Sequence, residues 1–354
     1  MRAVVMQAGE ITVEEIDEPQ LDPGQVLLAP HYSGICGSDL HARDMLRGLA
    51  ELDPEAPPVS IVPGHEFAGE VVAIGPDTDT SGNAGLSVGD LVTAIPFTHG
   101  EAAPETIGLS PSHSGGLAEL VVADAARTFR LPDGVDTRLG ALTEPIAVAV
   151  RAYERGAGAG PIVVVGAGPI GLGIIAVAAA ADRHPLIAVE PSSERRAAAL
   201  RMGADVAHEP GTTLSDLLAK VGHETSTISP LLTSEPPIAT VFECVGRPAV
   251  VQSILAEAPP HSRVVLAGAC HEPVEVNPLP LTTAEVTVTT SFAYRPADFA
   301  TAMSHLQHQP ERFGAFITSE RPLEEAADAF DDLANDPTEV KILIRPNDTI
   351  GSKA

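Results

Sequence analysis

The sequence has few cysteine residues and few positively charged ones. Its three cysteines among 354 residues, Cys36, Cys244 and Cys270, follow no regular spacing, which excludes a disulfide framework and fits a reducing cytoplasm. Lysine and arginine number 21 against 48 aspartate and glutamate residues, which gives a formal net charge of −27. Such an acidic chain repels phosphate backbones and anionic lipids, so we expect neither nucleic acid nor a membrane as a partner.

The sequence also lacks an apolar segment with a cleavage site after Met1, so no secretory signal is expected. The range 161–181 carries no charge over 21 residues and is long enough to suggest a membrane span. Glycine and proline residues interrupt this range, and a buried strand, a tight turn and a buried helix explain it better. We therefore expect a soluble, cytoplasmic protein.

The chain is too long for one ordinary core, so two domains are expected. Residues 1–95 alternate in short apolar runs separated by proline and glycine, which predicts a strand-rich, barrel-like region. From residue 160 strands and helices alternate, which predicts a parallel sheet with helices on both faces. Residues 97–115 predict a long irregular loop, and the proline-rich range 222–237 predicts a surface insertion. The segment after residue 290 is too short for a third domain and is expected to pack on the strand-rich region.

A glycine-rich motif opens the second region. Gly166, Gly168 and Gly171 follow an apolar strand directly, and the helix that they open includes Pro169 and Ile170. In a dinucleotide site the first glycine allows a tight turn, the second lets the backbone approach a pyrophosphate, and the third lets helix and strand pack closely. The helix N-terminus then stabilises the phosphate charge. These five residues are our candidates for binding the cofactor.

Glu190 ends the next strand, 19 residues after Gly171, where a carboxylate can accept hydrogen bonds from both ribose hydroxyls. Its charge would repel a 2′-phosphate, so NAD is favoured over NADP. Arg195 and Arg196 on the following helix leave NADP open, because an arginine at this point can bind a 2′-phosphate. Without a ligand, the motif would be only a glycine-rich turn.

A second constellation carries candidate metal ligands. Cys36, Ser38 and His41 lie in one glycine-containing run, and His65 and Glu66 follow within thirty residues. Sulfur and nitrogen donors suit zinc, and a catalytic zinc site needs only three protein ligands and an open position. The hydroxyl and imidazole groups of the first run can pass protons. We therefore expect a catalytic metal site here.

Each of these residues also has a plainer explanation. Cys36 alone would be a small buried hydrophobe, and His65 alone a hydrogen-bonded core residue. Glu66 has three possible roles, as a direct ligand, as a carboxylate that orients a ligand, or as a ligand that exchanges with water. Asp39 either orients a ligand in the same way or caps the turn. The third ligand must come from further along the chain, and Glu144 is the candidate. The plainer explanation for Glu144 is an exposed carboxylate at the start of a helix.

These segments resemble the zinc-dependent medium-chain dehydrogenase/reductase superfamily, the alcohol dehydrogenase-like enzymes, and most of all its branch of sorbitol, threonine and 2,3-butanediol dehydrogenases. The matching segments are spread over nearly the whole chain: Gly34–His41, Gly64–Gly69, Gly115–Glu119, Glu144-Pro145, Gly166–Gly171 and Val340–Ile344. The resemblance implies an α/β fold. A Rossmann domain with a doubly wound parallel sheet (148–290) would accompany a GroES-like, strand-rich catalytic domain (1–147 and 291–354).

The resemblance implies one catalytic Zn²⁺ per subunit, with Cys36, His65 and Glu144 as protein ligands. Glu66 would be a carboxylate that can approach the metal. A thiolate and a carboxylate together balance the two positive charges of zinc, as two thiolates would. The four closely spaced cysteines that hold the family's structural zinc are absent from residues 97–115, so no structural zinc is expected.

The resemblance also assigns roles around the substrate and the cofactor. Ser38 and His41 would form the proton relay, and Lys341 would contact the cofactor NAD. Ala42 and Tyr294 would line the substrate pocket. Ala42 and Ala293 stand near the points where the polyol enzymes carry aromatic and basic side chains that help hold a poly-hydroxylated substrate, which favours a less hydroxylated substrate.

The expected reaction is the reversible oxidation of a secondary alcohol, a diol or a less polar alcohol, to a ketone by hydride transfer to NAD. The family leads us to expect a homodimer or a homotetramer. Two other functions stay open. A zinc-free quinone or enoyl reductase of the same superfamily would not need Cys36, His65 and Glu144, and a non-catalytic NAD-binding protein would turn over no alcohol.

Overall fold

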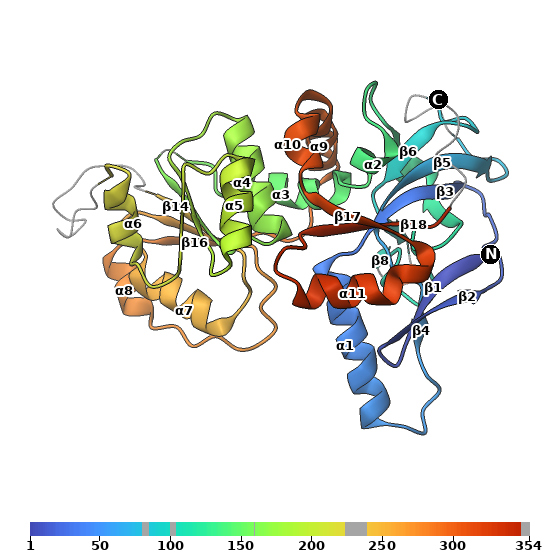
Figure 1. The fold of residues 1–354 in the computed structure, drawn as a ribbon, viewed down its shortest axis with the longest axis horizontal. Helices are drawn as coiled ribbons and strands as arrows, with labels where there is room; N and C mark the ends of the chain where they lie inside the picture. Colours follow the sequence, from blue (N-terminus) through green and yellow to red (C-terminus); the bar gives the residue numbers. More distant parts are fainter. Residues whose placement is uncertain (80–84, 100–103, 159, 224–238, 348–354) are drawn as a thin grey trace. The chain divides into compact units, whose positions relative to one another are not determined.

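The structure is a computed structural model that describes residues 1–79, 85–99, 104–158, 160–223 and 239–347 (Figure 1). The chain divides into two compact units. Unit 1 comprises Met1–Glu144, Leu306–Pro310 and Phe316–Ala354, and unit 2 comprises Pro145–His305 and Glu311–Ala315. Unit 1 is strand-rich and unit 2 contains a parallel sheet with helices, which confirms the expected fold class.

The limits of the units differ from the predicted ones at two points. Unit 1 first ends at Glu144 rather than at residue 147, and the segment after residue 290 is divided between the units. Most of helix α9 (Pro296–His308) belongs to unit 2. The reason lies in its packing, because Phe299 on this helix is completely buried. The apolar face of the helix therefore decides its place, which chain length alone does not reveal.

Unit 1 contains two sheets and a short hairpin. The three-stranded sheet has the order β2 (Glu10–Glu15), β1 (Arg2–Gln7) and β4 (Ser60–Ile61). The larger sheet has the order β10 (Thr128–Arg130), β6 (Leu91–Ala94), β5 (Glu66–Ile74), β3 (Gln25–Gly34), β18 (Lys341–Arg345) and β17 (Ile317–Pro322), and β9 (Val121–Asp124) also pairs with β3. The hairpin consists of β7 (Phe97–His99) and β8 (Pro104–Thr106), so the predicted irregular loop contains regular structure.

Helices cover parts of these sheets. They are α1 (Gly37–Leu52), α2 (Thr137–Gly140) and α11 (Ala326–Asn335), with the 3₁₀ turns η2 (Ala125–Arg127) and η4 (Leu323–Glu325). Helix α3 (Thr143–Arg155) begins in unit 1, and α10 (Pro310–Gly314) precedes β17. Leu46 of α1, Phe330 of α11 and Ile342 of β18 belong to one buried apolar cluster. This cluster holds α1 against the end of the large sheet.

Unit 2 contains one six-stranded sheet in which all neighbours are parallel. The order is β13 (Val206–His208), β12 (Leu186–Val189), β11 (Ile162–Val165), β14 (Thr240–Glu243), β15 (Arg263–Leu266) and β16 (Thr287–Thr290). Its helices include α4 (Pro169–Ala180), α5 (Ser193–Met202), α6 (Leu214–Lys220), α7 (Pro248–Glu257) and α8 (Pro278–Thr283). The strand order reverses between β11 and β14, the point where open α/β sheets bind their ligands.

The uncharged range 161–181 is the strand β11 followed by the helix α4, as predicted. Nearly every residue of α4 beyond its first turn is buried, which explains why the helix is apolar on all sides. No helix among the described residues is both long and apolar enough to cross a membrane. The predicted surface insertion at 222–237 lies almost wholly outside the residues that the structure describes.

Candidate active site

Cys36 is the N-cap of α1, two residues after the last residue of β3. Its backbone N–H donates a hydrogen bond to Oδ2 of Asp39 at 2.8 Å, which satisfies a donor at the helix start. The sequence analysis placed this run in a turn and missed the helix of 16 residues that follows. The helix start presents the Cys36 side chain, which is only partly buried.

His65 lies just before β5 and is almost completely buried. Its Nδ1 faces Oδ1 of Asp39 at 3.4 Å, and its Nε2 lies 3.2 Å from Oγ of Ser38. Burial opposes protonation, but the Asp39 carboxylate and Cys36 together raise the pKa of His65 well above its usual value. Asp39 therefore both caps α1 and orients the imidazole, so the two roles considered for it are combined.

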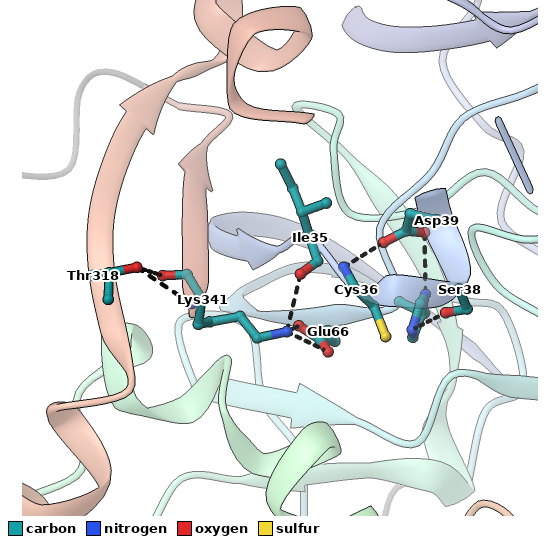
Figure 2. Close-up of polar contacts among 8 residues, drawn as sticks. Ile35, Cys36, Ser38, Asp39, Glu66, Thr318 and Lys341 are labelled. Carbon is teal, nitrogen blue, oxygen red and sulfur yellow. Dashed lines mark hydrogen bonds and ion pairs between the residues drawn. The ribbon is translucent and has the colours of Figure 1, made fainter. Parts of the chain in front are cut away.

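Glu66 begins β5 and is fully buried. Its Oε1 and Oε2 accept hydrogen bonds from Nζ of Lys341 at 2.7 and 2.5 Å, and the same ammonium donates to the carbonyl oxygen of Ile35 at 3.0 Å (Figure 2). Burial would lower the pKa of Lys341, but the charges of Glu66, Cys36 and Glu144 raise it. The ammonium is therefore surrounded by the anionic groups of the site.

The candidate ligand atoms of Cys36, His65 and Glu66 all lie within 4.8 Å of one another. A thiolate, an imidazole and a carboxylate are the donors that zinc prefers, and the imidazole is already oriented through its other nitrogen. These residues therefore fit a catalytic zinc. Glu144, expected as the third ligand, is buried at the start of α3 but is not part of this group. Its charge is one of those that raise the pKa of Lys341.

Three expected site residues have neighbours that the sequence did not indicate. Lys341, expected to contact the cofactor, directs its ammonium to Glu66, and its contact with NAD stays a prediction. Ala42, expected to line the substrate pocket, is buried in the apolar cluster of unit 1, and its contact with substrate stays a prediction. Tyr294 belongs to unit 2, where its ring stacks against Phe299 at 5.6 Å between centroids, and its contact with substrate stays a prediction.

The glycine-rich turn between β11 and α4 has the local geometry that its motif predicts. Gly166 adopts a φ of 97°, a conformation that side chains rarely tolerate. A Cβ on Gly171 would lie 1.8 Å from the carbonyl oxygen of Gly166, so helix and strand can pack this closely only with glycine. Nothing lies within 4 Å of a Cβ built on Gly168, which leaves space for a ligand beside the N-terminus of α4. Pro169 occupies the first turn of that helix.

Glu190 follows β12 and is almost completely buried. Its Oε2 accepts a hydrogen bond from the N–H of Ala167 at 2.8 Å, and its Oε1 accepts one from the N–H of Ser192 at 3.0 Å. The carboxylate therefore ties the glycine-rich turn to the following loop. The sequence predicted its place beside the turn but not these two bonds, which no side-chain pattern indicates.

Arg195 and Arg196, the two candidates for binding a 2′-phosphate of NADP, make different contacts in the structure. The Arg196 guanidinium donates to the carbonyl oxygens of Glu190 and Pro191 at 2.8 and 2.7 Å and to Glu209 at 2.8 Å. It is therefore committed to the protein itself. The backbone N–H of Arg195 donates to the N-cap side chain of α5.

A pocket of about 400 Å³ opens beside this turn within unit 2. It is lined by apolar residues, among them Val189 and Val245, and by the Gly166 turn, with Arg247 at one side. A mostly apolar pocket with a few polar groups at the switch point of a parallel sheet suits a planar base and its sugar.

The segment that replaces the family's structural zinc site is held by polar contacts. Oε2 of Glu105 accepts hydrogen bonds from the hydroxyls of Ser110, at 2.6 Å, and Ser112, and faces Nδ1 of His113 at 3.0 Å. These hydroxyls and the imidazole lower the pKa of Glu105 to about 2.

A dinucleotide site in a Rossmann unit and a zinc-type donor set in a GroES-like unit define the class of metal-dependent dehydrogenases. The comparisons with known proteins agree. The chain matches the alcohol dehydrogenase GroES-like domain over residues 22–133 and the zinc-binding dehydrogenase family over residues 169–308.

Relatives match over almost the whole chain. The chain is 31% identical to (R,R)-butanediol dehydrogenase of Bacillus subtilis (strain 168), over 96% of this chain and 97% of the relative. It is 29% identical to sorbitol dehydrogenase of Rattus norvegicus, over 98% of this chain and 96% of the relative. The crystal structure of 2R,3R-butanediol dehydrogenase from Bacillus subtilis has a TM-score of 0.81 at 29% identity and covers 98% of this chain and 99% of its own.

The chain belongs to the zinc-dependent, alcohol dehydrogenase-like family of medium-chain dehydrogenases/reductases. It is accordingly an oxidoreductase that acts on CH–OH donors. The expected cofactors, Zn²⁺ and NAD, agree with the family and with the Cys36, His65 and Glu66 group.

Proposed function

We propose that the protein uses zinc and NAD to oxidise a secondary alcohol, either a diol or a less polar alcohol, reversibly to a ketone. The observation that carries the proposal is the gathering of the Cys36, His65 and Glu66 donors within 4.8 Å. Relatives named butanediol and sorbitol dehydrogenases support the substrate class. The glycine-rich turn and its adjoining pocket support the dinucleotide.

Several side chains around the donor group can handle the substrate proton. When bound, zinc would polarise the alcohol oxygen and NAD would accept the hydride. The Ser38 hydroxyl lies 3.2 Å from Nε2 of His65, beside a proposed ligand atom, where it can accept the alcohol proton. His41 follows one turn later on α1, is exposed, and can exchange this proton with solvent. Asp39 keeps the His65 ring in place throughout.

Two features support NAD over NADP. The Glu190 carboxylate lies at the end of β12 and brings a negative charge to the place where NADP would bring its 2′-phosphate. Arg196, a candidate to bind that phosphate, instead binds two backbone carbonyl groups and Glu209. We therefore propose a preference for NAD.

The two competing functions have less support. A zinc-free quinone or enoyl reductase would have no use for the Cys36, His65 and Glu66 group. A non-catalytic NAD-binding protein would have no use for Ser38 beside it. For the compartment we propose the cytoplasm, which the three unpaired cysteines support.

The substrate is tested by measuring NAD reduction with the zinc-loaded protein across a panel of vicinal diols, polyols and apolar secondary alcohols. We expect turnover on diols or on apolar secondary alcohols, and slower turnover when NADP replaces NAD. A Cys36→Ser variant provides the blank. Zinc-loaded protein that turned over none of these alcohols would contradict the proposal, and preferred use of NADP would contradict the cofactor assignment.

A further inference from the structure

Glu66 belongs to the candidate metal group and to a buried ion pair at the same time. Both of its carboxylate oxygens are bound by Lys341, and the third donor of the ammonium goes to the carbonyl oxygen of Ile35 (Figure 2). Lys341 is only 2% exposed, so water does not weaken the pair. An ammonium has three donors, and all three are used here.

The backbone around this pair fixes its position. Strand β18 pairs antiparallel with β3, with Leu343 opposite Gly34, and the N–H of Ile35 donates to the carbonyl oxygen of Ile342 at 3.1 Å. A Cβ on Gly34 would lie 2.3 Å from Oε2 of Glu66. The carboxylate therefore fills the space that a side chain at Gly34 would occupy. The backbone pairing of β3 with β18 and the absence of a side chain at Gly34 therefore fix the position of the Glu66–Lys341 ion pair.

A metal at the donor group and the Lys341 ammonium compete for the same carboxylate. A thiolate from Cys36 and one carboxylate already balance the charge of Zn²⁺. The resemblance assigns that carboxylate to Glu144, whose charge also raises the pKa of Lys341, so Glu66 is a second carboxylate. The charge of Lys341 balances that additional carboxylate.

We propose that Lys341 is a positioning residue that competes with zinc for Glu66. By binding both oxygens, it prevents Glu66 from permanently filling the coordination position that a catalytic zinc keeps open for substrate. This inference rests on the proposed zinc-dependent function and gives Lys341 a role beside the expected cofactor contact. A purely structural Lys341 would leave the coordination of the metal unchanged.

The test compares wild type with Lys341→Met, which keeps a long apolar chain and removes the charge, and with Lys341→Arg as the charge-retaining control. Zinc affinity is measured by competition with a chelator, and the oxygen ligands of bound zinc are counted by X-ray absorption. We expect Lys341→Met to bind zinc at least about tenfold more tightly, because a positive charge beside the dication is lost. Its zinc gains one oxygen ligand, and kcat falls more than KM. Lys341→Arg stays close to wild type in all three readouts.

A second pair of variants isolates the role of Glu66. Lys341→Met leaves a buried carboxylate without its partner and destabilises the metal-free protein. In Glu66→Gln, where no such charge remains, adding Lys341→Met is expected to leave the oxygen count unchanged. An unchanged oxygen count in the single Lys341→Met variant, or a gain that persists in the Glu66→Gln background, would overturn the inference. Wild-type protein that bound no zinc would overturn the proposed function together with it.

Discussion

At the scale of single residues, the site depends on side chains that surround the donor group. Asp39 caps α1 through Oδ2 and faces the His65 ring through Oδ1, so one carboxylate positions two donors. Gly34 contributes by having no side chain, because the Glu66 carboxylate occupies the space beside its Cα. The residue types at Cys36, His65 and Glu66 were evident in the sequence. The partner of Glu66 was not, because Lys341 lies 275 residues away in the chain.

Substitution of Gly34 tests this packing. We expect Gly34→Ala to destabilise the protein by about 1–3 kcal/mol, because the new methyl group would displace the Glu66 carboxylate. In a Glu66→Ala background the same substitution should cost less than half as much, since the space is then vacant. Thermal unfolding of the four proteins in this cycle measures both effects.

Gly48→Ala is the matched control, because nothing lies within 4 Å of a Cβ at this position in α1. We expect it to leave stability unchanged or to raise it slightly. Equal costs of Gly34→Ala in the two backgrounds would contradict the assigned contact between Gly34 and Glu66.

At the scale of elements, the sequence predicts helices with typical capping residues better than helices with unusual ones. Helix α5 spans Ser193–Met202, and a serine N-cap and Gly203 in the left-handed conformation mark its ends in the sequence. Helix α1 was missed because its N-cap is Cys36, which is not a typical capping residue, and its first helical residue is Gly37. The segment after residue 290 was expected to pack on the strand-rich region as a whole, but its division between the units depends on packing.

The segment that follows β8 offers a pH test. The folded protein lowers the pKa of Glu105 from 4.5 to about 2, so its ionised form stabilises the segment. That stabilisation is complete above about pH 4.5 and is lost as the pH falls towards 2. We expect hydrogen exchange in residues 104–115 to become relatively faster over this range.

A Glu105→Gln variant serves as the control, because its amide does not titrate. In this variant the amide hydrogens of residues 104–115 are expected to exchange faster than those of wild type near neutral pH. Acidification should then reduce their protection little further. The same pH dependence of protection in both proteins would show that another group controls the segment.

At the scale of the whole molecule, we propose a homodimer or a homotetramer. Strand β16 is the last strand of its sheet, and Val288 on it and Phe292 after it are 41% and 92% exposed. An open strand edge with apolar residues can pair antiparallel with the same strand of a second copy about a two-fold axis. This surface is therefore the one that we propose for self-association.

Sedimentation at micromolar concentration checks this proposal. We expect wild type to be at least dimeric and the double variant Val288→Lys with Phe292→Asp to be smaller. Pairing of the two strand edges would bury the new charges, whereas in separate copies they remain in contact with water. Leu52→Asp, at an 82% exposed position of α1, is the control and should keep the wild-type size. A monomeric wild type would contradict self-association, and an unchanged double variant would contradict this edge as the interface.

We propose that Cys36 and His65, together with a carboxylate of Glu144 or Glu66, hold one zinc ion that is required for turnover. The most direct measurement is a zinc titration of metal-free protein in which bound metal and alcohol-dependent NAD reduction are followed together. We predict that both saturate at one zinc per chain, and that Cys36→Ser shows neither tight binding nor turnover. Alcohol-dependent NAD reduction by the metal-free protein, or by a zinc-free Cys36→Ser variant, would contradict the account.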